Sequence, residues 1–311
     1  LTYESDKVCL FKLDGPEKFG VVTQYDGIVI GDYADGITLA FPSFKAGMSS
    51  NIEDYSTDEL KSYHTVILTG FSYDTRQKAE EMVRSLADSG VNVVIDMTHV
   101  PADSATRQHV FLGVTDMSVS LKSSYPIFSY DGEQISTTGF PDDMSEWNTG
   151  YITGAMNVTG TFAYEMEQLA FAATDENSQN IKYVGLNLLY YYSVTGDSGA
   201  EKIVEDILGV SPEDLPERTL IPISSEITVN DAPADIADGA VINTTLAYQD
   251  IFVSDSEIMD ENNMLCVGTG VTNIKFKYPL FWPGVLVSIV GFCGMSAIWI
   301  LACKDYGKKK D

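Results

Sequence analysis

The sequence predicts a mixed α/β domain with a mostly parallel sheet, then a small β-sandwich-like domain and one C-terminal transmembrane helix. Three observations lead to this architecture. Short Val, Ile and Leu runs alternate with helical patterns in the first two thirds of the chain, β-branched residues and turn signals fill the next stretch, and an uncharged apolar run begins at Leu280. Continuous apolar runs are typical of strands buried on both faces, and strands that alternate with helices form parallel sheets.

Three apolar runs predict the first strands, at residues 27–32, 65–71 and 91–96. A helical pattern lies between the second and the third run. Asp74 is expected to cap this helix, because a Gln follows three residues later, and Gly90 is expected to end it. Its apolar face would consist of Ala79, Met82, Val83, Leu86 and Ala87. This order predicts two parallel strands joined by a right-handed crossover.

A hairpin and a second helix are predicted farther along the chain. Residues 168–174 and 181–189 flank a polar turn, and the second arm is strongly apolar. Asp197 is expected to cap the helix that follows. The buried face of this helix would consist of Ala200, Ile203, Val204, Ile207 and Leu208.

The composition changes near residue 216, and this change sets the expected domains. From there to residue 279, alternating and β-branched residues separated by turn signals predict a β domain. We therefore expect an α/β domain, a membrane-proximal β domain, a transmembrane helix and a tail, at residues 1–215, 216–279, 280–303 and 304–311.

The apolar run predicts a membrane anchor. It contains no charged residue, and about 20 helical residues cross a bilayer core. Lys304 and three later lysines follow it, so the positive-inside rule places the tail in the cytoplasm and the main domain outside the cell membrane. Residues 1–30 show no basic and apolar export signal. We therefore expect the chain to be part, or a processed product, of a longer protein.

The charge and the missing motifs exclude several functions. The formal net charge is -26, which argues against nucleic acid, because phosphate binding needs clustered Lys and Arg. No P-loop, GxGxxG or zinc-spaced Cys/His pattern occurs, so we expect no cofactor and no metal centre. Cys9 and Cys266, the two cysteines outside the apolar run, could form one disulfide. Two acidic groups are weak calcium candidates: Asp231, Asp235 and Asp238, and Asp255, Glu257, Asp260 and Glu261.

Polar residues at the predicted strand ends form the candidate ligand site. In an open α/β sheet, ligands bind beyond the carboxyl ends of the strands. The candidates are Asp32, Tyr73, Asp74, Asp96, His99 and Asn187, with Tyr33 and Thr98 beside them. Asp96 and His99 suit acid–base chemistry by residue type, and Asn187 would sit within the later strand. Asp and Asn after a strand also serve as turn and capping residues, so a structural role stays open for each.

Other residue types at the site are not expected to act as catalysts or ligands. The GxSxG motif is absent, and no Cys follows a strand at a turn into a helix. No catalytic residue is therefore predicted. His64 and His109 lack metal spacing and are expected to be packed or surface residues.

Several stretches carry a family resemblance: GDYADGITLAFPSFKAG (31–47), IEDYSTDELKSYHTVILTGFSYD (52–74), VVIDMTHVPAD (93–103) with FLGV (111–114), and YVGLNLLYY (183–191). Together they resemble the bacterial membrane proteins labelled "6-pyruvoyl-tetrahydropterin synthase-related". The resemblance implies a multi-helix region similar to GT-C glycosyltransferases, then an extracytoplasmic domain similar to class I glutamine amidotransferases, a β domain and a terminal helix. This chain would be the extracytoplasmic C-terminal part, and the upstream helices would explain the missing export signal.

Two departures limit what the resemblance implies. The enzyme class in the label uses a three-histidine zinc site, and class I amidotransferases use a Cys nucleophile; this chain has neither. We therefore expect a non-catalytic accessory domain of a GT-C-like cell-envelope protein. Its partners would be a glycan, a lipid-linked sugar, or upstream transmembrane helices or another membrane protein. The alternatives are a free-standing surface recognition or adhesion protein, with a calcium-linked version, and an enzyme that uses Asp96 and His99.

Overall fold

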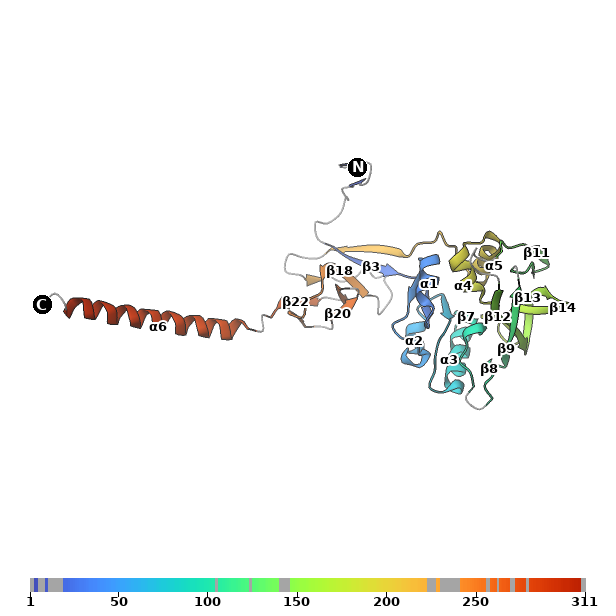
Figure 1. The fold of residues 1–311 in the computed structure, drawn as a ribbon, viewed down its shortest axis with the longest axis horizontal. Helices are drawn as coiled ribbons and strands as arrows, with labels where there is room; N and C mark the ends of the chain where they lie inside the picture. The colour runs from blue at the N-terminus through green and yellow to red at the C-terminus, as the bar shows by residue number, and fades with distance from the viewer. Residues whose placement is uncertain are drawn as a thin grey trace. The chain divides into compact units, whose positions relative to one another are not determined.

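The computed structural model divides the chain into two compact units (Figure 1). One comprises Thr23–Arg218, called here the α/β unit, and the other comprises Leu1–Val22 with Thr219–Asp311, called here the β unit. The structure describes residues 3–4, 9–10, 19–103, 106–122, 125–139, 146–222, 228–229, 241–255, 258–261, 263–268, 272–277 and 280–308.

Five parallel strands form one half of the 12-stranded sheet in the α/β unit. In spatial order they are β5 (Phe44–Ala46), β4 (Gly27–Ile30), β6 (Thr65–Leu68), β7 (Asn92–Asp96) and β15 (Ile181–Val184). The predicted strand–helix–strand crossover is confirmed, because β6 and β7 pair in parallel and α3 (Arg76–Asp88) connects them. The cap is one residue later than predicted: Thr75, not Asp74, precedes the helix.

The other strands of this sheet are antiparallel, so the sheet is mixed and the expectation of a mostly parallel sheet is wrong. Chain turns of a few residues join long strands here, and antiparallel pairs need no helical crossover. The strands are β8 (His109–Phe111), β9 (Val114–Lys122), β10 (Phe128–Tyr130), β11 (Glu133–Ile135), β12 (Glu146–Gly154), β13 (Met156–Tyr164) and β14 (Glu167–Asp175).

Helices cover both faces of the parallel strands. The side chains of Val29, Ile67 and Val94 join a core cluster with α1 (Ala34–Ala40), α4 (Leu188–Thr195) and α5 (Ser198–Leu208). Their neighbours along each strand, such as Val66 and Val93, join the opposite cluster, which contains the buried face of α3. Alternate side chains point to opposite faces of a strand, so both faces are apolar and the unit has three layers. Smaller helices are η1 (Ile52–Asp54), α2 (Thr57–Leu60) and η2 (Met97–His99).

The predicted hairpin is confirmed only in its first part. β14 and β15 pair antiparallel, but β15 ends at Val184 and α4 starts at Leu188. The apolar stretch to residue 189 therefore contains a turn and a helix start as well as a strand. The predicted helix after Asp197 is confirmed: Asp197 accepts hydrogen bonds from the backbone N–H groups of Gly199 and Ala200, and the predicted apolar face is buried.

The β unit contains two small sheets around a common apolar cluster, as the β-sandwich-like prediction requires. The strands of the first sheet, in spatial order, are β16 (Glu217–Pro222), β3 (Phe19–Gln24), β18 (Val241–Ala247), β21 (Met264–Gly268) and β20 (Ile258–Glu261). The strands of the second sheet are β17 (Thr228–Val229), β22 (Thr272–Phe276) and β19 (Phe252–Ser254). A separate pair joins β1 (Tyr3–Glu4) and β2 (Cys9–Leu10). β3 pairs with β18, so residues before Val22 group with this unit and not with the α/β domain expected at residues 1–215.

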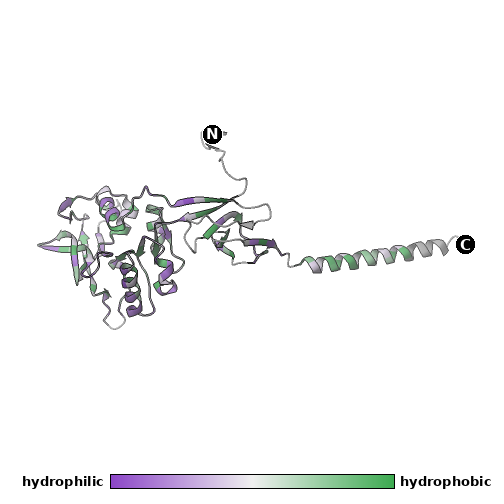
Figure 2. Ribbon diagram, turned by 180° about the vertical axis from the view of Figure 1, so that it is seen from behind, coloured by the Kyte–Doolittle hydropathy of each residue, from purple (hydrophilic) through white to green (hydrophobic). Residues whose placement is uncertain are grey.

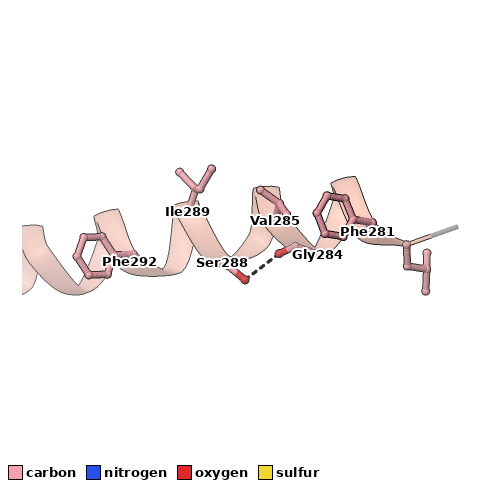
Figure 3. Close-up of a pocket in the computed structure, with 7 residues that line it drawn as sticks. Phe281, Gly284, Val285, Ser288, Ile289 and Phe292 are labelled. Carbon is pink, nitrogen blue, oxygen red and sulfur yellow. Dashed lines mark hydrogen bonds between the residues drawn. The ribbon is translucent and has the colours of Figure 1, made fainter. Parts of the chain in front are cut away.

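The C-terminal helix α6 (Phe281–Lys308) contains a span, Phe281–Ile300, that is long and apolar enough to cross a membrane. None of this span is buried within the protein, and Figure 2 shows hydrophobic colouring along it. A shallow depression follows one side of the helix (Figure 3). There the Ser288 hydroxyl donates to the Gly284 carbonyl at 2.8 Å, which leaves no unpaired hydroxyl on that side and suits contact with lipid.

Membrane attachment through α6 gives a direct prediction. The full chain is expected to stay in the membrane pellet after alkaline carbonate extraction, whereas a chain that ends after Lys277 is expected to be released. The reason is that about 20 apolar helical residues exposed to lipid remove a large area from water. Immunoblotting of both fractions measures this. Release of the full chain by carbonate would contradict the assignment of α6 as an anchor.

Candidate functional site

The candidate site is built around Asp96 at the carboxyl end of β7. This residue is 1% exposed, and its side chain accepts three hydrogen bonds. The Thr69 hydroxyl donates to Oδ2 at 2.8 Å, His99 Nδ1 contacts the same oxygen at 2.7 Å, and the Thr98 backbone N–H donates to Oδ1 at 3.1 Å. A buried carboxylate is tolerated only when such donors surround it. Residues that follow the ends of β6 and β7 therefore hold the Asp96 side chain in place.

The pairing with Asp96 sets the chemistry of His99. Burial of the ring lowers the pKa of His99, but the hydrogen bond and the charge of Asp96, together with the charge of Asp116, outweigh it and hold this pKa above its usual value. Because Nδ1 faces a carboxylate, Nδ1 carries hydrogen and Nε2 is the nitrogen left for another group. The pair can therefore bind a polar ligand or exchange a proton.

Two glycines bring an aromatic ring to His99. Gly31 has a φ of 129°, and a Cβ there would lie 2.1 Å from the Thr69 carbonyl oxygen. Gly70 has a φ of 67°, and its Cβ would lie 2.6 Å from the Tyr33 ring. Only glycine fits both the backbone angles and the space. The close contacts at Gly31 and Gly70 let the Tyr33 ring lie 4.2 Å from the His99 ring, measured between ring centroids. Tyr33 is still 43% exposed.

A strained turn carries Asn187 to the same region. Leu186 and Asn187, between β15 and α4, have φ values of 61° and 53°, which are costly for a residue as bulky as leucine. Hydrogen bonds fix the turn: the Leu186 N–H donates to the Gly150 carbonyl at 2.6 Å, and the Asn187 N–H donates to the Thr98 hydroxyl at 3.0 Å. Asn187 is thus a helix-start residue and not a strand residue, because the backbone leaves the sheet at Gly185.

Asp116 on β9 is a site residue that the sequence analysis missed. It is paired across the sheet with His109 on β8, and its charge acts on His99. Burial raises the pKa of Asp116 to about 6; the charge of Asp96 adds to this increase, and His109 and His99 oppose it. The Nδ1 of His109 donates to the Val100 carbonyl at 2.6 Å, so His109 is held in place beside the site.

The structure therefore brings together three of the six predicted site residues: Asp96 and His99 are in direct contact, and Thr98 links Asn187 to them. Asp32 lies next to Tyr33 and accepts a hydrogen bond from the Ser50 hydroxyl at 2.8 Å. The other two make different contacts. Tyr73 stacks on Phe111, with ring centroids 5.9 Å apart, and Asp74 accepts from the Asn51 amide at 3.2 Å.

The metal and disulfide expectations are only partly covered by the described residues. Among these residues, no group of three His, Cys, Asp or Glu side chains could hold a metal ion. The first calcium candidate group and Glu257 lie outside the described residues, and Asp255 accepts hydrogen bonds from Asn273 at 2.9 and 2.7 Å. Cys266 is buried in β21, but the Cys9 side chain lies outside the description, so a Cys9–Cys266 disulfide stays a prediction.

Comparisons with known proteins place the site within a family. A search of curated proteins finds no match. One similar solved structure is the alpha-L-fucosidase isoenzyme 2 from Paenibacillus thiaminolyticus, with 10% sequence identity and a TM-score of 0.42. The match covers 83% of this chain and 49% of that chain, and a likeness at this level carries no argument about function. The family model described as "Domain of unknown function (DUF8560)" matches residues 26–191, which include all six predicted site residues. Because this range is more than half of the 311 residues, the chain belongs to the DUF8560 family.

Proposed function

We propose that this chain is the extracytoplasmic part of a membrane-anchored cell-envelope protein and that its α/β unit binds a glycan or a lipid-linked sugar without catalysing a reaction. The observation that carries the proposal is the strained turn at Leu186 and Asn187 beside the Asp96–His99 pair. A sharp strand-to-helix turn of this kind holds the nucleophile in several hydrolase folds. Here the turn holds leucine and asparagine, and neither side chain is a nucleophile.

The same turn supports an amidotransferase-like origin for the α/β unit. Five parallel strands with helices on both faces support this origin, and seven antiparallel strands extend the same sheet beyond them. The backbone strain at the turn persists although no nucleophile uses it, and strain of about 1–3 kcal/mol per residue is retained only where the surroundings enforce it. We interpret the site as one that has kept the shape of an enzyme centre and uses it for binding.

The exposed side chains suit a hydroxyl-bearing ligand. Tyr33 offers a partly exposed ring, and aromatic rings pack against the apolar C–H face of a sugar. Asp32, the neighbour of Tyr33 in the chain, and the His99 ring that lies against Tyr33 can exchange hydrogen bonds with hydroxyl groups. Three carboxyl groups, Asp32, Asp96 and Asp116, make the region unfavourable for the diphosphate of a lipid-linked sugar, so the sugar itself would be the bound part.

The lysines that follow the apolar span of α6 and the acidic main domain support an orientation with the tail in the cytoplasm. In this proposal the β unit is next to the membrane, and the partners are the helices of a GT-C-like glycosyltransferase, either on the same polypeptide or in a complex. Protease digestion of sealed, right-side-out vesicles tests the orientation. The protease is expected to digest the main domain outside the vesicle, and the tail inside the vesicle is expected to be protected.

The binding function can be tested on the full chain in detergent. Methyl glycosides of glucose, galactose and N-acetylglucosamine are the probes, and thermal melting is the readout. A probe at ten times its Kd is expected to stabilise the fold by about 1.4 kcal/mol. Tyr33→Ala is expected to remove this shift, and Tyr190→Ala, which changes a tyrosine of matched exposure (41% against 43%), is expected to keep it. No shift with any probe would count against the proposal.

A second candidate function, acid–base catalysis, is favoured by the 2.7 Å contact between Asp96 and His99. Turnover of nitrophenyl glycosides by the purified chain, abolished in His99→Gln, would replace the binding proposal with this one. The calcium-linked adhesion alternative instead predicts a higher melting temperature in calcium than in chelator.

A further inference from the structure

We infer that Asp116 and Asn187 form the acceptor half of the candidate site and bind hydroxyl groups of the ligand, which selects a neutral polyhydroxyl ligand over its phosphorylated form. This inference rests on the proposed function and names the ligand class and two of the residues that recognise it.

The first step is that Asp116 and Asn187 flank the same backbone segment. Asp116 faces Ile152 on β12 in the sheet register, and its carboxylate lies over Gly150: a Cβ at Gly150 would be 1.8 Å from Asp116 Oδ1. The Gly150 carbonyl in turn holds the Leu186 N–H at 2.6 Å. Gly150 therefore connects the two residues: its missing side chain leaves room for the Asp116 carboxylate, and its carbonyl holds the turn that carries Asn187.

The second step is that each residue has an acceptor without a donor. Asp116 Oδ1 and Asn187 Oδ1 are both buried and make no hydrogen bond within the described part of the chain. A buried acceptor without a partner is unfavourable, and native proteins leave few such groups except where a ligand or a functional role requires them. Both atoms accept and neither donates, so the group that satisfies them must supply hydrogens.

The third step concerns charge. The titratable groups that act on Asp116 are Asp96, His99 and His109. A phosphate placed here would meet the oxygens of Asp116, Asp96 and Asn187 and would be repelled. Two hydroxyl groups of a sugar, in contrast, can donate hydrogen bonds to Asp116 Oδ1 and Asn187 Oδ1. An ammonium group can donate as well, so an amino sugar is included among the probes to separate the two sources of hydrogen.

The pH dependence of binding follows from this arrangement. A carboxylate accepts hydrogen bonds more strongly than a carboxylic acid, so ligand hydroxyls favour the ionised form of Asp116. Affinity is therefore expected to rise as the pH increases through the pKa of about 6 that burial gives this group. Below that value, affinity falls by up to about tenfold per pH unit, because binding must then release a proton.

The experiment measures binding of methyl glucoside, glucose 6-phosphate and glucosamine to the full chain in detergent, by calorimetry between pH 5 and 8. We expect methyl glucoside to bind more tightly at pH 8 than at pH 5, and glucose 6-phosphate to bind at least tenfold more weakly. Asp116→Asn, which keeps an acceptor oxygen but cannot ionise, is expected to bind with an affinity that no longer changes through pH 6. Asp116→Ala is expected to bind at least tenfold more weakly than wild type at pH 8.

Folding and specificity controls accompany these variants. Asp88→Asn changes an exposed carboxylate at the end of α3 and should match wild type throughout. Asp116→Asn should also melt at a higher temperature than wild type at pH 8 but not at pH 4, because it removes a buried carboxylate whose ionisation costs stability above its pKa.

The outcomes separate the two proposals. Wild-type affinity in Asp116→Ala, or a pH profile unchanged in Asp116→Asn, would overturn this inference and leave the proposed function intact. If glucosamine binds and methyl glucoside does not, the ligand supplies an ammonium group in place of hydroxyl groups. This result would overturn the inference as well. Failure of all three probes to bind any variant would overturn the inference and the proposed function together.

Discussion

Replacing Gly31 with alanine is expected to destabilise the protein by about 3 kcal/mol or more and to abolish ligand binding. The φ of 129° at Gly31 lies in a region that L residues rarely adopt, and the new Cβ would sit 2.1 Å from the backbone carbonyl of Thr69. Backbone cannot rotate away as a side chain can, so the carboxyl ends of β4 and β6 must separate. This movement would take the Tyr33 ring away from His99.

Thermal melting of the full chain in detergent measures this effect. A loss of 3 kcal/mol corresponds to a fall of roughly 6–12 °C for a unit of this size. Gly139→Ala is the matched control, because its Cβ would meet nothing within 4 Å, and it should leave the melting temperature within about 1 °C. Equal melting of the two variants would show that the β4–α1 turn is not held as described.

Replacing Asp96 with alanine is expected to cost about 3–5 kcal/mol. The change leaves the Thr69 hydroxyl, the Thr98 N–H and the His99 ring without their common acceptor in a site that is 1% exposed. Asp96→Asn keeps one carbonyl oxygen and is expected to cost less. Asp32→Ala is the control, since Asp32 is exposed and accepts a single hydrogen bond from Ser50, and it should cost below about 1 kcal/mol.

The contribution of the His99 side chain, paired with Asp96, to stability should depend on pH in a defined direction. Because the folded pKa of His99 is raised, protonated His99 stabilises the fold below the unfolded pKa of about 6.5, and this contribution is lost as pH rises through the folded value. The difference in melting temperature between wild type and His99→Gln should therefore be larger at pH 5.5 than at pH 8.5. A difference that grows with pH would contradict the pairing of His99 with Asp96.

The parallel strands β4, β6 and β7 were predictable because their signals are local, whereas the short strand β5 was not predicted. The runs that became β4, β6 and β7 are apolar on both faces, and the α3 pattern between two of them leaves one topology. Asp96 and His99 follow from the same signals, since the carboxyl end of a strand can be read from where its apolar run stops.

Asn187 and Asp116 could not be placed in the same way. Apolar residues dominate the stretch around Asn187, and Gly185 and Asn187 within it do not by themselves show where the strand ends. The turn is held by hydrogen bonds to Gly150 and Thr98. Asp116 reaches the site only through the register of β9 against β8 and β12. Its pairing with Ile152 on β12 joins residues that are 36 positions apart (152 − 116), and a one-residue shift would point Asp116 to the other face.

The pairing of β3 with β18 has a consequence for biosynthesis. Val21 and Val22 pair with Asn243 and Ile242, so β3 leaves the ribosome long before its partner β18, and the α/β unit is made in between. A nascent chain would therefore hold an unpaired strand edge while the inserted unit folds. The α/β unit can complete its contacts during synthesis, but the β unit closes last, as a long-range and slow step. Release of the chain before residue 243 should leave a folded α/β unit with an N-terminal strand open to chaperones or to a second copy.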